Sequence, residues 1–186
     1  MHARKLALAL ALAAAFGAQA ASAADLALTA DGQWHAFDVD DIAAASGGLE
    51  WIDLDGSALS FSFSGPATLM VVDGGFAGDR FEVYDNGVLL GATSAAVDSY
   101  PASVGMDFEV AIGDAGYSRG VYLLGGGNHT ITGMLSTSAL DDLGMPLNAT
   151  VGAVQLLAAP VPEPETYALM LAGLGLIGLA ARRRAN

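Results

Sequence analysis

The run Phe81-Glu82-Val83-Tyr84-Asp85-Asn86-Gly87-Val88-Leu89-Leu90 decides the fold class of this protein. An Asn-Gly dipeptide between two apolar-rich runs is the strongest short-range indication of a β-hairpin, because both residues tolerate the positive φ angles of a tight turn. Short apolar runs separated by turn residues continue along the chain on both sides of this hairpin. The central part of the protein is therefore expected to consist of β-strands.

Seven further segments have the composition of strands. Residues 59–63 alternate apolar and polar side chains, which is the period of a half-buried strand. Ser64-Gly65-Pro66 predicts that residues 67–72 form the hairpin partner of this strand, and Gly125-Gly126-Gly127-Asn128 predicts another turn. The remaining strands are expected at residues 33–39, 108–112, 121–124, 129–135 and 150–157.

About eight strands with frequent turns predict an all-β domain, a β-sandwich of jelly-roll type. Residues 39–46 are the one stretch with helical character, and no internal repeat or second domain stands out. The expected organisation is a signal peptide at residues 1–23, a β-sandwich domain at residues 24–160 and a sorting tail at residues 161–186.

The N-terminus has the three parts of a secretory signal peptide. Arg4 and Lys5 are followed by an apolar core at residues 6–16 and by the small residues Ala21-Ser22-Ala23. This order of charged, apolar and small residues predicts export of the chain and cleavage after Ala23.

The C-terminus contains a proline-rich motif, an uncharged apolar run and a basic end. Pro162-Glu163-Pro164 precedes the run at residues 167–181, and Arg182-Arg183-Arg184 follows it. The run predicts a transmembrane helix of about 22 Å, short against a hydrocarbon core of about 30 Å unless snorkelling arginines extend its reach. The arginines are expected to act as a cytoplasmic stop, which leaves the domain outside the inner membrane.

This order of motif, span and arginines resembles the PEP-CTERM sorting signal, and the resemblance is confined to the C-terminal tail. It implies recognition by an exosortase, a membrane-embedded processing enzyme. It also implies export across the inner membrane, membrane anchoring before processing, and a final place in the cell envelope, at the surface or in the extracellular matrix. Extracellular polysaccharide is a further candidate partner.

The central domain is strongly acidic. Between Asp25 and Asp142 two arginines stand against eighteen acidic residues, a formal charge of −16. Such a domain repels nucleic acid phosphates, so no nucleic acid partner is expected. The chain has no cysteine, which excludes a disulfide framework, a thiolate metal site and a cysteine nucleophile.

Two acidic clusters near glycines predict a calcium site. Asp38 and Asp40 form the first cluster, and Asp53 and Asp55 form the second. Calcium prefers several oxygen ligands, and carboxylates at alternate positions can point toward one ion, although neither cluster completes an EF-hand loop. Asp73 and Asp79 flank a glycine-rich loop and could contribute to a similar site. The alternative is a solvated acidic surface, and no organic cofactor is expected.

Other segments match known functional motifs in sequence but lack the structural context that those motifs require. Gly116-Tyr-Ser118-Arg-Gly120 fits the hydrolase elbow G-x-S-x-G, but a strand rather than a helix is expected after Ser118. The glycines between Gly173 and Gly178 fit a dinucleotide fingerprint but lie inside the predicted span. His35 and His129 are too few for a zinc site without cysteine.

Three functions fit these features. The first is a non-catalytic exported surface or extracellular-matrix protein, because no catalytic constellation is found. The second is a calcium-dependent carbohydrate-binding module with an aromatic platform. The third is a hydrolase, which would need two carboxylates about 5–10 Å apart in a groove. The aromatic platform of the second would come from Trp34, Trp51, Tyr84, Tyr117 or Tyr122.

Overall fold

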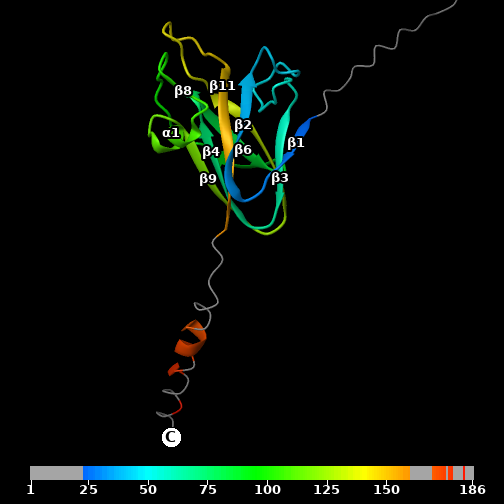
Figure 1. The fold of residues 1–186 in the computed structure, drawn as a ribbon, viewed down its shortest axis with the longest axis vertical. Helices are drawn as coiled ribbons and strands as arrows, with labels where there is room; N and C mark the ends of the chain where they lie inside the picture. The colour runs from blue at the N-terminus through cyan, green and yellow to red at the C-terminus, as the bar shows by residue number, and fades with distance from the viewer. Residues whose placement is uncertain (1–22, 160–168, 175, 178–181, 183–186) are drawn as a thin grey trace, which may run out of the picture.

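A computed structural model describes residues 23–159, 169–174, 176, 177 and 182 (Figure 1). Up to residue 159 the described chain is mostly β-strand, so the all-β prediction is confirmed. The elements are β1 (Ala24–Ala27), β2 (Asp31–Asp40), β3 (Leu59–Ser64), β4 (Ala67–Asp73), β5 (Gly75–Phe76), β6 (Arg80–Asp85), β7 (Val88–Ala92), β8 (Ser103–Gly105), α1 (Phe108–Gly113), β9 (Arg119–Leu124), β10 (Asn128–Thr137) and β11 (Ala149–Ala158).

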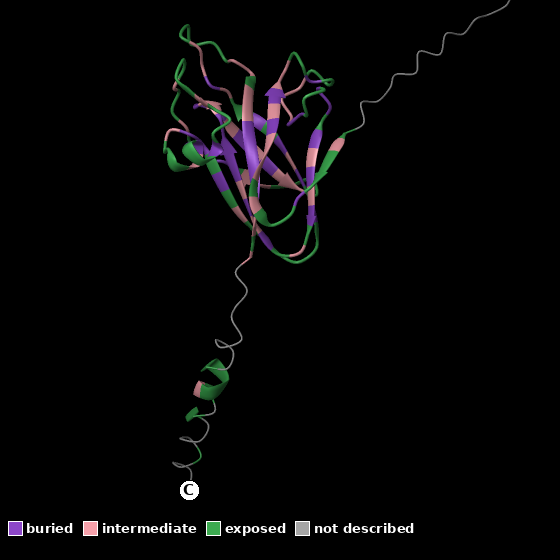
Figure 2. Cartoon of the chain, in the orientation of Figure 1, coloured by how far each residue is buried: buried purple, intermediate pink, exposed green. Residues whose placement is uncertain are grey.

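Two large sheets pack face to face. The five-stranded sheet has the order β1-β3-β10-β6-β7, the four-stranded sheet has the order β2-β11-β4-β9, and β5 pairs with β8 in a small third sheet. Both large sheets contribute to one apolar core, with Phe61 and Phe81 from the first and Val71 and Val154 from the second. Purple buried segments alternate with pink intermediate and green exposed ones along the strands (Figure 2), as expected for strands with one inward face.

The hairpin predicted at Asn86-Gly87 is confirmed. β6 pairs antiparallel with β7, with Asp85 opposite Val88. Asn86 and Gly87 have φ angles of 49° and 77°, the positive values that a two-residue hairpin turn of this kind requires.

The hairpin predicted between residues 59–63 and 67–72 is wrong. β3 pairs with β1 and β10, whereas β4 pairs with β11 and β9. The turn at Ser64-Gly65-Pro66 therefore carries the chain from one sheet to the other. Each strand has one apolar face, and burying both faces in the shared core requires the strands to oppose each other across it.

The strand predicted at residues 108–112 is also wrong, because these residues form α1. Asp107 caps the helix by accepting a hydrogen bond from the backbone N–H of Val110 at 3.2 Å. Phe108, Ala111 and Ile112 lie at helical spacing and pack together on the outer face of the four-stranded sheet. The short sequence fits both the two-residue period of a strand and the 3.6-residue period of a helix. The Asp107 cap, together with the outer sheet face against which the apolar side chains pack, favours the helix. Residues 41–46, where helical character was expected, form turns.

An aromatic stack fills the centre of the core. Phe37 and Trp51 stack with ring centroids 4.0 Å apart and an interplanar angle of 17°. Glycines make room for them: a Cβ at Gly133 in β10 would lie 2.1 Å from Trp51 Cε2, and one at Gly152 in β11 would lie 2.3 Å from Phe37 Cζ. Glycine at these two positions thus lets the aromatic rings pack closely against the backbones of the two strands.

The predicted tail and signal peptide fall largely outside the described residues. Residues 1–22 of the signal peptide are not described, and of the predicted span 167–181 only residues 169–174, 176 and 177 are described, all helical. Within the described part of the chain, no helix reaches the length and apolar character needed to cross a lipid bilayer. The transmembrane helix stays a prediction.

Candidate functional site

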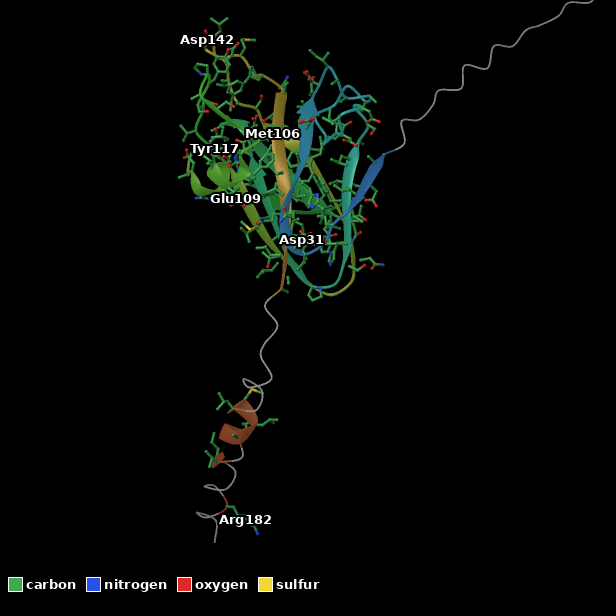
Figure 3. The ribbon with its side chains drawn as sticks, in the orientation of Figure 1. Asp31, Met106, Glu109, Tyr117, Asp142 and Arg182 are labelled. Atoms are coloured by element: carbon green, nitrogen blue, oxygen red, sulfur yellow. The ribbon has the colours of Figure 1, made fainter. Side chains whose placement is uncertain are left out.

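The acidic residues gather at one end of the two-sheet domain. The turns at residues 28–30, 65–66, 86–87 and 125–127, near the end of β11, carry no charged side chain. In Figure 3 Asp142 lies at the opposite end, and Asp31 lies toward the uncharged turns. The acidic end is formed by the loops after β2, β4, β7 and β10, and it carries Asp38, Asp40, Asp41, Glu50, Asp53, Asp55, Asp73, Asp79, Asp98, Asp141 and Asp142.

A groove opens at this acidic end beside β2. Asp38 and Ile52 join the loop after β2 back to that strand through two backbone hydrogen bonds, of 3.0 Å and 2.8 Å. The groove has a volume of about 430 Å³ and is lined by Asp38, Asp53 and apolar side chains. Leu54 and Met106 on its border are 92% and 65% exposed. An apolar wall with two carboxylates suits a ligand that has both an apolar part and a positive charge.

A smaller hollow of about 180 Å³ adjoins the groove and shares Asp38 and Asp53 with it, while Asp40 lines only the hollow. Burial raises the pKa of Asp38, and the nearby charges of Asp53 and Asp40 raise it further. The structure therefore brings together three of the four residues predicted to bind calcium.

Asp55 lines neither the hollow nor the groove. Its Oδ1 accepts the backbone N–H of Ser57 at 2.9 Å, and the hydrogen bonds from Ser57 lower its pKa. Asp40 also has a structural role, because its Oδ1 accepts the N–H groups of Ile42 and Ala43 at 2.8 and 3.0 Å. Across the described residues, no three His, Asp or Glu side chains are grouped so that they could hold a metal ion. Calcium binding in the groove stays a prediction.

The aromatic platform expected for a sugar ligand is only partly exposed. Trp51 is 1% exposed within the core, and Tyr117 is buried beneath α1. Trp34 is half-buried and donates its indole N–H to Glu109 at 2.7 Å. Tyr84 and Tyr122 are also half-buried, and they lie on different strands. These five side chains do not form one surface for a sugar ring to stack on.

Ser118 does not occupy a nucleophile elbow. Its side chain is fully buried, and its hydroxyl shares a 2.9 Å hydrogen bond with that of Thr93. β9 follows directly, as the sequence indicated, so no helix exposes the serine above a sheet. His35 and His129 lie on β2 and β10 and do not approach it through any hydrogen bond in the described part of the chain.

His129 instead connects strands at the end of the domain whose turns are uncharged. Its Nδ1 lies 2.8 Å from Asp85 Oδ2, its Nε2 lies 3.0 Å from the carbonyl oxygen of Gly125, and its ring stacks on Phe63. Burial alone would lower the pKa of His129, but the hydrogen bonds to Asp85 and Gly125 raise it overall. Since both partners are acceptors, this site suits an imidazolium with a proton on each nitrogen.

The chain thus forms an all-β domain with an acidic end, and one residue after its last strand the C-terminal tail begins. Residues 160–184 of that tail match the PEP-CTERM protein-sorting motif. Its tail thus carries the sorting motif of exported proteins that are processed by an exosortase, a membrane enzyme. The match covers the tail alone. No curated protein and no solved structure matches the chain.

Most of the residues that the sequence singled out in the sorting tail lie outside the described part of the structure. This applies to Pro162, Glu163, Pro164, Arg183 and Arg184. Arg182 is described as helical and exposed and is labelled in Figure 3. Their order along the chain is enough for the family model, because a sorting signal is read as a linear segment.

Proposed function

We propose that this chain is a non-catalytic surface or extracellular-matrix protein that presents its acidic end away from the cell. The observation that carries the proposal is the placement of the tail. β11 ends at Ala158, at the end of the domain whose turns are uncharged, and the sorting motif begins at residue 160. An exosortase substrate anchored through this tail directs the opposite, acidic end outward.

Chain length supports this orientation. The predicted membrane helix begins at residue 167, and nine residue steps from Ala158 span at most about 30 Å when fully extended. The uncharged end must therefore stay close to the bilayer while the precursor is anchored. Anionic lipid headgroups repel the acidic end but not the uncharged turns, so electrostatic repulsion favours the same orientation.

We also propose the jelly-roll assignment for the domain. Apart from the β6–β7 hairpin, successive strands of the two large sheets alternate between them, so that β2-β11-β4-β9 faces β3-β10-β6-β7, with β1 added at one edge. Eight strands in two facing sheets joined in this way support a double Greek key.

Single cysteines test the surface proposal directly, because the chain has none of its own. Leu54→Cys places a thiol at the acidic end, where Leu54 is 92% exposed, and Gly126→Cys places one at an open turn of the uncharged end. With a membrane-impermeant maleimide on intact cells, we expect rapid labelling at residue 54 and slower labelling at residue 126. Labelling of neither variant before cell lysis would contradict surface display, and faster labelling at residue 126 would contradict the orientation.

Calcium-dependent carbohydrate binding is a second proposal. The groove of about 430 Å³ supports it, since ligand pockets commonly measure 300–1,000 Å³ and combine apolar walls with a few polar groups. Binding of the full chain, solubilised in detergent, to a glycan array with calcium and with EDTA tests it. Calcium-dependent binding that Asp53→Asn removes would support this function, and binding to no glycan would leave the structural function.

A further inference from the structure

Two carboxyl groups are buried together behind the loop that joins β4 to β6. Asp73 ends β4 and is 0% exposed, and Asp79 precedes β6 and is 1% exposed. The two side chains are close enough for the negative charge of Asp79 to raise the pKa of Asp73. This group lies outside the groove, since neither residue lines it.

Asp73 has no hydrogen-bond partner. Both of its carboxylate oxygens are inaccessible to solvent and unbonded. Backbone N–H groups of Gly74, Gly78 and Asp79 lie near enough to lower its pKa in part, yet none completes a hydrogen bond with it. Buried carboxylates are rarely left in this condition, because loss of hydration is compensated only by a partner.

Asp79 is better supported, and a third carboxylate stands next to it. Asp79 Oδ1 accepts the backbone N–H of Ala139 at 2.8 Å. Asp98 Oδ1 accepts that of Leu140 at 3.2 Å, and the charge of Asp98 acts on Asp79. A Cβ at Gly78 would lie only 2.4 Å from Asp98 Oδ1, so the glycine is what lets this carboxylate approach.

No basic side chain neutralises the group within the described part of the chain. The one ion pair found there joins His129 to Asp85. Arg80 donates to the carbonyl oxygens of Ser94 and Thr93, and Arg119 donates to that of Ile112. Burial raises the pKa of Asp73 to about 9 and that of Asp79 to about 6, as expected for carboxylates without a counter-charge.

We propose that Asp73 and Asp79 bind a divalent cation, with calcium as the ion, and that Asp98 borders the site. A bound cation would place a positive charge beside the two buried carboxylates, which no basic side chain of the described residues does. Calcium is a hard ion that takes six to eight oxygen ligands, so backbone carbonyls and water would complete its coordination. The proposal does not depend on surface display, because the site forms within the folded domain.

Calcium-dependent unfolding of the full chain in detergent tests this site. After treatment with EDTA and removal of the chelator, we expect calcium at a hundredfold excess over Kd to raise the unfolding midpoint by about 5 °C or more. Isothermal titration calorimetry should give one ion per chain. Asp73→Asn should remove both effects and still show a cooperative transition without calcium, because a neutral amide of the same shape suits a buried position.

Control variants separate this site from the groove. Asp53→Asn changes a carboxylate of the groove, and it should keep the calcium shift. Asp142→Asn changes an acidic residue in a surface loop, and it should keep the shift as well. Asp79→Asn provides a second test if Asp73→Asn does not fold. An unchanged calcium shift in the Asp73 and Asp79 variants, a shift lost only in Asp53→Asn, or no shift in the parent protein would each overturn the proposal.

Discussion

Asp73 carries an acidic group where an ionised carboxylate is unfavourable. Its pKa of about 9 means that, without a metal ion, the folded protein holds a proton there at neutral pH, whereas the unfolded chain has released it. The folded state therefore binds more protons than the unfolded state between about pH 4 and pH 9. Stability then falls as the pH rises through that range.

The metal-free protein should lose stability by up to about 1.4 kcal/mol for each pH unit because of Asp73 alone. Asp79, with a pKa of about 6, adds to the loss only below that pH. Urea unfolding in EDTA at pH 6, 7 and 8 measures the slope. We expect Asp73→Asn to flatten it, and a slope equal to that of the parent protein would show that Asp73 ionises normally.

His129 also has a raised pKa, but here the fold favours the charged form of the side chain. Its raised pKa means that the interactions with Asp85 and Gly125 contribute fully below about pH 6.5 and are lost as the pH rises through the folded pKa. The two strand ends that His129 joins should loosen in that range.

An NMR titration of the His129 imidazole should give a pKa above that of a free histidine. Asp85→Asn removes the carboxylate acceptor at 2.8 Å and should lower the pKa. Asp25→Asn is a suitable control, because Asp25 bonds Ser60 and Ser62 on another strand. Equal His129 pKa values in the parent and Asp85→Asn proteins would contradict the assigned pair.

At the scale of elements, the central strands β10 and β11 each carry a glycine where an aromatic ring packs against the strand. Gly133 and Gly152 leave room for Trp51 and Phe37, which stack between the sheets. Glycine is usually unfavourable within a strand, so its presence at both positions reflects close approach of an aromatic ring.

Gly133→Ala should destabilise the domain by about 1–3 kcal/mol, because the added methyl group overlaps Trp51 and forces the stack to shift. Gly126→Ala is the matched control. A Cβ there meets nothing within 4 Å, and we expect a change of about 0.5 kcal/mol or less. Urea unfolding measures both, and equal values for the two variants would contradict the packing described for Trp51.

At the scale of the whole molecule, the sorting tail and the acidic sites lie at opposite ends of the domain. The tail matching the sorting motif follows the uncharged end of the domain, while the groove and the buried carboxyl pair lie toward the acidic end. Processing of the tail therefore need not disturb either acidic site.

Replacing Pro162, Glu163 and Pro164 by alanine should stop processing by the exosortase. In the native host, the variant should accumulate in the inner membrane at its larger, unprocessed mass, whereas the parent protein leaves that fraction. Immunoblots of separated membrane and extracellular fractions measure this. Asp142→Asn should be processed like the parent protein, and normal processing of the alanine variant would contradict the role of the motif.

The sequence by itself determined the class of the domain, most strand positions, the Asn86-Gly87 hairpin and the sorting tail. These features are local: strand alternation, positive φ in a tight turn and a linear motif are all set by neighbouring residues. Strand partners were not determined locally, because an apolar face does not specify which other face will cover it. That is why β3 and β4 were expected to pair, whereas α1 was expected to be a strand because its short sequence fits both the strand and the helix period.

The acidic sites show the same division. The sequence singled out Asp38, Asp40, Asp53 and Asp55, but only the tertiary structure joined three of them at one hollow and left Asp55 with Ser57. It also distinguished Asp73 and Asp79 from many similar aspartates by burying them. Burial and charge proximity depend on contacts between residues far apart in the chain, and composition alone does not encode where those contacts fall.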